Sequence, residues 1–593
     1  MGQTRGVEAG NEPPGNSELG RRVAELADLI VLDGGDSHRV AHYRRAATVI
    51  RRFHHSLAEI ILSGTDLTRV PGIGKGLAGF LGELVRTGSA RRLEDYRTRI
   101  PRGILDLMRV DGVGATRART LRDAGVESVE RLEAALDGRW IHGLDGFGPS
   151  VASHIRRSLE ARRALRGKSL LSEADRAVAR LTDVLRGNGV DFSIAGDIRR
   201  RVEIVATTDI VCAESSGALW DLACECPGAR VDGNRGDNPV PVEVDDVPIR
   251  LVAVPRELMG PIAHHLTGPP AYLGALAARA RSYRLEITPT GIVGAADTGG
   301  PGGTGGTATD TGPASGETAI YERLRLPWIP PELREDGTTI ERAERGVPSL
   351  VTLDDIHGDL HLHTTWSDGA ANLQTMVEAA AARGYSYIAV TDHSPSTGVV
   401  PGLDAAALRA QAAEIARVQR DFADIAILRG CEVDILPDGT LDLDDETLAT
   451  LDIVLVSVHS AFAMSRSRMT DRIIRAMENP LVDVVCHLTG RKLGRRNPYP
   501  LDLTAVLEAA RDLDVAVEVN GSPRRLDLNH CGLWLCRELG VRVVVNSDAH
   551  SVARLDNMRY GIDQARRGWL QAAEIANTRK LRAFRQWLGR RRD

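Results

Sequence analysis

Histidine and carboxylate residues follow a series of short apolar runs in the C-terminal part of the chain, and this placement most constrains the fold. From about Asp355 onward, helical segments such as LQTMVEAAAARG and LTAVLEAARDL alternate with the apolar runs YIAVTDH, IAILRGCEVDI, IVLVSVHS, VDVVCHL, VAVEVN and VRVVVNSDAH. Alternating strand and helix signals predict βα units around a parallel sheet, and we expect a barrel. The polar clusters lie at the C-terminal ends of the runs, on the face that holds the active site in such barrels.

Nine of these polar residues form a candidate metal site. His361 and His363 alternate at the end of a strand, so their imidazoles share one face. The other candidates are Asp368, His393, Glu432, His459, His487, Asp548 and His550. Imidazole together with carboxylate suits Zn, Mn or Fe. A single histidine beside an apolar strand is more often a structural residue, but the repetition at successive strand ends predicts a multinuclear site.

The motifs around these residues resemble those of the PHP family, the polymerase and histidinol phosphatase domain. The resemblance covers roughly 357–575 and rests on GDLHLHTTWSDG, TDHS, GCEVDIL, SVHSAF, CHLTGR and NSDAHS. It implies a distorted β/α barrel in which the nine residues bind three divalent metals. Closely spaced divalent ions lower the pKa of a bound water, so the expected nucleophile for phosphate-ester hydrolysis is a metal-bound water.

Arginines in the strand-end loops are candidates for phosphate contacts. They are Arg491, Arg495, Arg496, Arg524 and Arg525. The guanidinium fork matches a phosphate, so these side chains could clamp the non-scissile phosphates of a nucleic-acid strand. The alternative is that they are solvated surface charges.

Three Gly-apolar-Gly turns precede helical runs in the N-terminal half: Pro71–Gly74, Asp111–Gly114 and Asp145–Gly148. Such a turn lets backbone N–H groups at a helix start approach a phosphate. One turn is weak evidence, but three at similar spacing indicate helix-hairpin-helix elements, which hold DNA by its backbone. The candidate DNA contacts are Gly72, Gly74, Lys75, Gly112, Gly114, Gly146 and Gly148.

In this order the elements resemble the bacterial X-family DNA polymerases that carry a PHP domain. HRVAHYRRAATVIRR, VPGIGKGLAGF, LMRVDGVGATRARTL and the connector WIPPELRE carry the resemblance. It implies a helical DNA-binding domain at 1–95 and a helix-hairpin-helix domain at 96–168. A palm and thumb of the α+β nucleotidyltransferase type follow at 169–335, with a flexible Gly/Thr/Ala-rich loop at 294–317, and a PHP domain at 350–593.

The palm departs from that family at its catalytic carboxylates. Nucleotidyl transfer needs several carboxylates to hold two metals, but here the strand reads Thr207-Thr208-Asp209, and a later strand carries Arg250 where the third aspartate is expected. Asp209 is therefore the sole remnant of the palm site. Asp197 stands where the family has a serine facing the triphosphate and adds like charge there. Phe80 falls where a lyase lysine would stand, so lyase activity is not expected.

Bulk properties exclude some classes of protein. No segment approaches eighteen apolar residues, and the polar N-terminus lacks the core of a signal peptide, so a cytoplasmic protein is expected. The seven cysteines are irregularly spaced and do not suggest a disulfide framework. The net charge of −5 decides nothing about nucleic acid.

The leading hypothesis is a metal-dependent DNA phosphoesterase of repair, acting as a 3′–5′ exonuclease, 3′-phosphatase or abasic-site endonuclease, with an inactive palm. Its expected partner is gapped, nicked or 3′-ended duplex DNA, and a monomer is expected. The alternatives are an active gap-filling polymerase with a PHP exonuclease, a small-molecule PHP phosphatase, and a non-catalytic DNA-binding scaffold.

Overall fold

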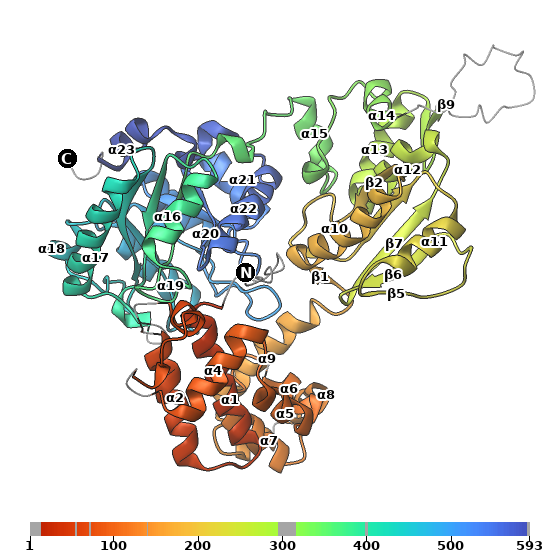
Figure 1. The fold of residues 1–593 in the computed structure, drawn as a ribbon. Coiled ribbons are helices and arrows are strands. Elements are labelled where there is room, and N and C mark those ends of the chain that lie inside the picture. The colour runs from red at the N-terminus through yellow and green to blue at the C-terminus, as the bar shows by residue number, and fades with distance from the viewer. Residues whose placement is uncertain are drawn as a thin grey trace, which may run out of the picture.

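A computed structural model describes residues 14–51, 53, 56–69, 73–108, 110–138, 140–294, 316–397 and 401–589. Gly72 and nearly all of the loop expected at 294–317 lie outside these residues. Figure 1 shows a barrel at the C-terminal end of the chain, an α+β unit built on an open sheet, and a helical region beneath both.

The helical region has one continuous hydrophobic core. Its helices are α1 (Asn16–Leu32), α2 (Ser37–Arg51), α3 (Leu57–Leu62), α4 (Lys75–Thr87), α5 (Arg91–Arg99), α6 (Arg102–Met108), α7 (Ala115–Asp123), α8 (Val129–Asp137) and α9 (Pro149–Arg163). On α1, Leu19, Val23 and Leu26 recur at helical spacing and are all buried. The core runs from Leu19 to Leu159, so the segments 1–95 and 96–168 pack as one body.

The open sheet of the α+β unit has five strands in the order β2-β4-β7-β6-β5. Its elements are α10 (Leu171–Gly187), β2 (Phe192–Gly196), β4 (Thr208–Cys212), α11 (Ser216–Glu225), β5 (Ala229–Val231), β6 (Val240–Val244), β7 (Val247–Ala253) and α12 (Met259–Thr267), with β1 (Ser169–Leu170) paired to β3 (Ile204–Val205) beside it. The β6–β7 hairpin turns at Asp245 and Asp246, whose φ angles of 51° and 64° are those of a tight hairpin turn.

A smaller unit completes this lobe and leads into the barrel. It contains α13 (Pro270–Ser282), β8 (Leu285–Thr288), β9 (Gly291–Gly294), α14 (Glu317–Arg323) and α15 (Thr338–Glu344). Its core includes the fully buried Tyr272 and Tyr321, whose hydroxyls lie 2.9 Å apart. Trp569 of the barrel lobe joins the same core.

The barrel has seven parallel strands in sequence order. They are β10 (Gly358–Leu362), β11 (Tyr387–Val390), β12 (Ala426–Asp434), β13 (Ile453–Ser457), β14 (Val484–Val485), β15 (Ala516–Asn520) and β16 (Val543–Asn546). The helices between and after them are α16 (Leu373–Ala382), α17 (Ala405–Val418), α18 (Asp445–Leu448), α19 (Arg466–Met477), α20 (Leu503–Asp512), α21 (His530–Leu539), α22 (Met558–Arg567) and α23 (Leu581–Gly589). A parallel bridge between Leu362 and Ala549 brings the first strand to the last, so the barrel is nearly closed. The predicted β/α barrel is confirmed.

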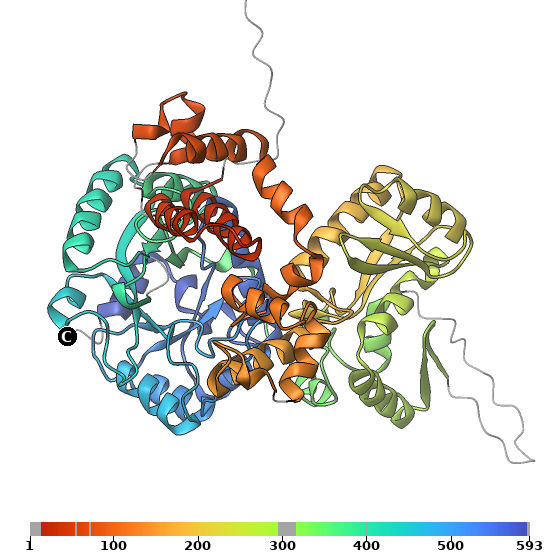
Figure 2. The same cartoon turned by 90° about the horizontal axis from the view of Figure 1, so that it is seen from below.

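The two ends of the barrel are covered by different parts of the chain. Tyr387 stacks on Phe584 of α23 with ring centroids 4.9 Å apart, and Trp587 joins the same apolar cluster. The amino ends of the strands are therefore closed by the C-terminal helix. The carboxyl ends face the helical region, which Figure 2 shows in front of the barrel.

The α+β unit is bound to the barrel by buried ion pairs. Arg567 of α22 contacts Glu203 at 3.3 Å and Glu335 at 2.6 Å, and its side chain is 1% exposed. Glu203 also accepts a hydrogen bond of 3.1 Å from Arg491. Arg201 joins Asp175 of α10 to Asp563 of α22, at 2.6 and 2.7 Å. Because these charges are buried and paired, the two bodies are held in one relative position.

Within the described part of the chain, no helix has the length and apolarity needed to cross a membrane.

Candidate metal centre

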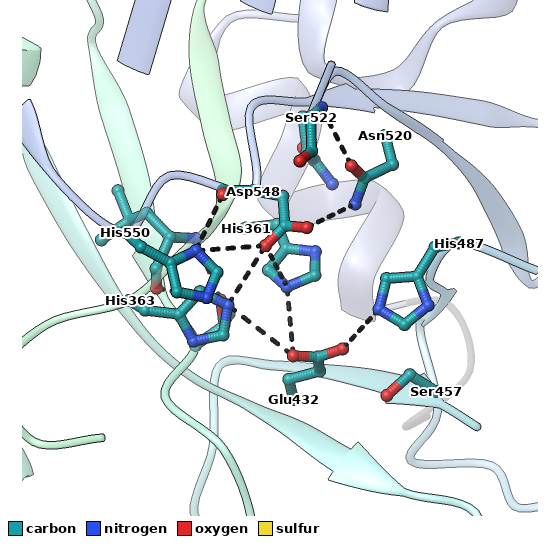
Figure 3. A network of polar contacts seen from close by, with 12 residues as sticks. His361, His363, Glu432, Ser457, His487, Asn520, Ser522, Asp548 and His550 are labelled. Carbon is teal, nitrogen blue, oxygen red and sulfur yellow. Dashed lines mark hydrogen bonds and ion pairs between the residues drawn. The ribbon is translucent and has the colours of Figure 1, made fainter. Parts of the chain in front are cut away.

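The nine candidate ligands come together at the carboxyl ends of the barrel strands. Figure 3 shows part of this cluster, with His361, His363, Glu432, His487, Asp548 and His550. His361 and Glu432 lie within β10 and β12, and the others lie just beyond the ends of β10, β11, β13, β14 and β16. The most exposed side chain of the nine, that of His550, is only 22% accessible. The sequence pattern thus predicted residues that are close in space although they span nearly 200 positions.

Glu432 lies at the middle of the cluster, with imidazoles on both sides of its carboxylate. Oε1 lies 2.8 Å from Nε2 of His487 and 3.5 Å from Nε2 of His459. Oε2 lies 3.0 Å from Nδ1 of His393 and 3.3 Å from Nε2 of His361. One carboxylate oxygen therefore faces each half of the cluster, as in a carboxylate that bridges two ions.

Two further carboxylates, those of Asp548 and Asp368, lie close to His363 and His550. Oδ1 of Asp548 lies 3.5 Å from Nε2 of His363 and 3.5 Å from Nδ1 of His550. Oδ2 of Asp368 lies 3.2 Å from Nε2 of His550. Among the described residues, potential ligand atoms within 4.8 Å of one another form four groups: His363, Asp368, His393 and His550; His361, His363 and Asp548; His393, Glu432 and His459; and His361, Cys486 and Glu518.

Backbone conformation at the site is unusual. His487 has a φ of 30° and Asp548 a φ of 52°, in the left-handed region that side chains with a Cβ seldom adopt. Such conformations persist where the surroundings determine them strongly and are typical of functional sites. Here they turn two candidate ligands inward at the point where a strand ends.

Charges at the site are strongly coupled. Burial alone would raise the pKa of the Glu432 carboxyl, but His393, His361 and His459 hold it well below its usual range. Burial together with the neighbouring His550 and His393 rings lowers the pKa of His363 to about 3. The buried carboxylates are therefore ionised at neutral pH, and His363 is neutral, which is the form that binds a metal.

Several buried ring nitrogens have no hydrogen-bond partner in the described residues. They are Nε2 of His361, both ring nitrogens of His363, Nδ1 of His393 and Nδ1 of His487. Carboxylate oxygens lie 3.0 to 3.8 Å from these nitrogens of His361, His363 and His393. Buried polar atoms are nearly always satisfied, so unpaired nitrogens around a shared centre fit the donor set of a divalent cation.

Residues behind the ligands were missed in the sequence. Glu518 of β15 is fully buried, and its Oε1 lies 2.6 Å from Nδ1 of His361. Oδ1 of Asp434 lies 2.7 Å from Nδ1 of His459. Each carboxylate fixes which ring nitrogen of its histidine stays free for a ligand. A charged residue inside the apolar run VAVEVN was the signal that could have identified Glu518.

The cavity that leads to the cluster is lined partly by the barrel and partly by the helical region. A cavity of about 640 Å³ is bounded on one side by Asp368 and His550, and on the other by Glu18 and Arg21 of α1 and Glu59 of α3. A substrate reaching Asp368 therefore passes the N-terminal helices.

Two of the five arginines predicted to contact phosphate, Arg491 and Arg524, occupy different environments. Arg491 is 9% exposed, and its guanidinium donates to the backbone of Arg525 and Leu526 and to Glu203. It belongs to the interface with the α+β unit, which corrects its predicted role as a phosphate contact. Arg524 is 48% exposed and lines a groove with Arg162, Arg166 and Arg495.

The glycine turns precede helices as predicted. Gly74, Gly114 and Gly148 are the N-cap residues of α4, α7 and α9, and all three are exposed. Arg117 donates to the carbonyls of Gly112 and Gly146, at 2.9 Å each, and so joins the second turn to the third. Lys75 is the first residue of α4 and is exposed. Exposed backbone N–H groups at adjacent helix starts suit a phosphate chain.

In the α+β unit, Asp209 and Arg250 lie side by side on β4 and β7. Nε of Arg250 donates to Oδ1 of Asp209 at 2.6 Å, and the Asp209 side chain is 1% exposed. The expectation that Asp197 adds charge facing a triphosphate needs correction. Its carboxylate accepts hydrogen bonds from the backbone N–H groups of Ala206 and Thr207 and pairs with Arg200, so it holds a loop together.

Comparisons with protein-family models match four parts of the chain. They are a helix-hairpin-helix domain at 14–90, a SAM-like helix-hairpin-helix tandem at 104–161, a DNA polymerase beta thumb at 262–335 and a PHP domain at 359–499.

Similar curated proteins include one that matches nearly the whole chain and others that match about a third of it. The chain is 33% identical to the DNA polymerase/3′-5′ exonuclease PolX of Bacillus subtilis over 584 residues, covering 96% of this chain and 98% of the relative. It is also 33% identical over 215 residues to a probable phosphatase of Caldanaerobacter subterraneus, covering 33% of this chain and 79% of that protein. A probable phosphatase of Clostridium acetobutylicum is 28% identical over 202 residues, covering 32% of this chain and 78% of that protein.

Proposed function

The chain belongs to the X-family DNA polymerases that carry a C-terminal PHP domain, and from this membership we propose that it is a metal-dependent DNA phosphoesterase of repair. Its main reaction is the removal of nucleotides from a 3′ end, a 3′–5′ exonuclease reaction at the barrel site. The observation that carries the proposal is the convergence of all nine His, Asp and Glu residues around Glu432.

We assign divalent metals, up to three in number and Mn, Zn or Fe in kind, to this cluster. The proposed ligands are His361, His363, Asp368, His393, Glu432, His459, His487, Asp548 and His550. The unpaired ring nitrogens support the assignment. When bound, such ions lower the pKa of a water and neutralise charge on the phosphoryl oxygens.

The chain's own residues organise this centre. Glu432 spans both halves of the cluster, and Glu518 and Asp434 orient His361 and His459. Nε of Arg525 lies 3.4 Å from Oδ2 of Asp548, so a cation stands beside the site where a phosphate would add negative charge. Burial of the cluster excludes bulk water and strengthens these interactions.

DNA is the proposed substrate because of the helical region. The exposed turns at Gly74, Gly114 and Gly148 can hold a backbone, and Arg524 lines a groove beside the barrel rim. We propose that gapped, nicked or 3′-ended duplex DNA binds there and presents its 3′ end to the barrel, and that a monomer suffices. A metabolic phosphatase has no need for these elements.

The palm is proposed to be inactive in polymerisation. Arg250 neutralises Asp209, and Thr207 stands where a further carboxylate would be needed. One carboxylate paired with a guanidinium does not hold two divalent cations. The palm would then act as a rigid body that binds DNA and supports the barrel.

A 3′-phosphatase activity is the second candidate. The relatives named probable phosphatases match about a third of this chain, a length close to that of the barrel domain, which favours monoester hydrolysis as a second reaction of this site. Labelled gapped DNA ending in a 3′-hydroxyl, a 3′-phosphate or an abasic site separates the reactions when it is incubated with Mn²⁺. We expect mononucleotide release from the 3′-hydroxyl end, and release of phosphate alone from the second substrate would favour the phosphatase. Failure to process any of the three substrates would contradict both candidates.

A further inference from the structure

A cavity lies between loops of the barrel rim and the helical region. One wall consists of two rim loops, one containing Phe462 and the other residues 495–500. The opposite wall is α9, with His154 and Arg157. Phe462 lies three residues after His459, and residues 495–500 belong to the loop that follows His487, so the cavity lies on the same barrel rim as these two candidate ligands. Its volume of about 130 Å³ is room for one ring-sized group.

The floor of the cavity contains a stacked aromatic and guanidinium pair. Cζ of Arg496 lies 3.9 Å from the centroid of the Phe462 ring, and the Tyr499 ring is stacked at 6.2 Å from Phe462. A hydrogen bond of 2.8 Å from Arg496 Nε to the carbonyl of Gly490 fixes the guanidinium. Ala461 has a φ of 53°, which turns the loop just before Phe462. Flat aromatic and guanidinium surfaces of this kind bind nucleobases by stacking.

Two further cations, Lys492 and Arg525, lie close enough to Arg496 for their charges to interact. The backbones of Lys492 and Arg496 pair across a tight loop, and Nε of Arg525 lies 3.4 Å from Oδ2 of Asp548. Burial and the nearby Arg525 and Arg496 charges lower the pKa of Lys492 to about 8. The described residues offer its ammonium no hydrogen bond or ion pair. Partly buried like charges without enough counter-charge are stabilised by an added anion, and a phosphodiester supplies one.

The same helix that forms one wall of the cavity is linked to the DNA-binding turns. The backbone N–H of Asp111 donates to Oγ of Ser158 on α9 at 2.9 Å, and α9 itself begins after Gly148. A strand held by its backbone at these turns is therefore held by the body that also forms the cavity.

We propose that this cavity is a subsite for the unpaired 3′ end of a DNA strand. One base stacks on the Phe462–Arg496 pair, and the adjoining phosphate lies between Lys492 and Arg525. The inference rests on the proposed function and adds a requirement to it: at least one nucleotide must leave the duplex, because a base still paired and stacked in a duplex cannot enter a cavity of this size.

Binding by the metal-free protein tests the subsite without reference to catalysis. An oligonucleotide with 2-aminopurine at its 3′ end is titrated with the full chain in EDTA. Phe462→Leu keeps an apolar side chain but removes the ring, and it should weaken binding by roughly 5- to 150-fold. Phe462→Tyr should stay within about threefold of the wild type, because stacking is retained. Lys492→Ala should reduce the slope of log affinity against log salt concentration by about one unit, which corresponds to one lost phosphate contact.

Arg511→Ala is the matched control. Arg511 is an exposed arginine at the C-terminal end of α20, next to the amino end of β15, whereas the proposed subsite lies at the carboxyl ends of the strands. It should bind like the wild type. Binding by Phe462→Leu equal to that of the wild type would overturn the proposal, and so would equal affinity for a blunt duplex and for a duplex with a 3′ overhang.

A second arm separates the subsite from the reaction. With Mn²⁺, the ratio of kcat/KM for a single-stranded oligonucleotide to kcat/KM for bis(p-nitrophenyl) phosphate should fall in Phe462→Leu, because the small diester has no nucleobase to place on Phe462. An unchanged ratio would contradict the subsite. If the wild type hydrolyses neither substrate, the proposed function fails, while the binding arm still decides whether the subsite exists.

Discussion

Arg250 donates a hydrogen bond of 2.6 Å to Asp209, and the two residues stand in register on neighbouring parallel strands. Asp209 is the one acidic residue left where this family has its polymerase carboxylates, and its charge is already matched by a guanidinium that is itself 49% exposed. The barrel shows the opposite arrangement, with three carboxylates among buried imidazoles, several of whose ring nitrogens have no hydrogen-bond partner in the described residues. Metal-dependent chemistry is therefore expected in the barrel and not in the palm.

The palm should not extend a primer. The measurement is template-directed dNTP addition on gapped DNA with Mg²⁺ or Mn²⁺. The background is the His361→Ala/His363→Ala double variant, so that nucleotide removal does not mask extension. No addition is expected, because one neutralised carboxylate cannot position two ions. Addition that disappears on Asp209→Ala would show that the palm is active.

Glu518→Gln should weaken metal binding without unfolding the barrel. The carboxylate accepts a hydrogen bond from His361 Nδ1 and so leaves Nε2 free for a ligand. Losing such a partner lowers metal affinity by roughly 10- to 100-fold. Competition with a chromogenic chelator measures this affinity. Glu446→Gln, at an exposed position on α18, is the control and should match the wild type. Unchanged affinity in Glu518→Gln would exclude this positioning role.

Metal affinity should rise with pH below about 9. Burial alone would lower the pKa of His393, but Glu432 and Asp368 raise it to about 9. The metal-free protein therefore holds a proton on His393 at neutral pH, and an incoming cation must displace it. For each proton displaced, the metal affinity falls about tenfold for every unit by which the pH is lowered. Calorimetry at pH 7 in two buffers of different ionisation enthalpy should detect release of at least one proton. A buffer-independent enthalpy would contradict the assignment of His393 as a ligand.

Docking of the palm on the barrel should depend on Glu203. Burial opposes its charge, but Arg567 and Arg491 lower the pKa of Glu203 to about 2. Since the pKa is lower in the folded state, the stabilisation is fully present above the unfolded pKa of about 4.3 and is lost as pH falls toward 2. A shift of this size corresponds to about 3 kcal/mol.

The difference in Tm between the wild type and Glu203→Gln measures this contribution. It should be constant from pH 8 to about 5 and shrink at lower pH. Asp232→Asn, an exposed acid of the same unit, is the control and should show little difference at any pH. A Glu203→Gln difference that grows on acidification would be inconsistent with the interface described above.

The candidate ligands could be predicted from the sequence, but the carboxylates that orient them could not, and the reason is physical. Histidines at strand ends are detectable because the strand period and the barrel topology place them on one rim. Glu518 accepts a hydrogen bond from His361, which lies 157 positions earlier in the chain. Such a pairing depends on the order of the strands around the barrel and not on the local sequence pattern. Arg491 was expected at a phosphate because it follows a strand, but its partner Glu203 lies 288 positions away. The Asp209–Arg250 pair could be expected because both occupy motif positions on adjacent strands.

The most direct measurement is release of mononucleotides from 3′-labelled gapped DNA by the full chain in Mn²⁺, compared with the His361→Ala/His363→Ala variant. The account predicts steady release by the wild type, its loss on chelation, and at least a hundredfold decrease in the variant, on the order of the loss seen when a catalytic centre is removed. Release by the variant at the wild-type rate would show that the barrel cluster is not the centre of the reaction.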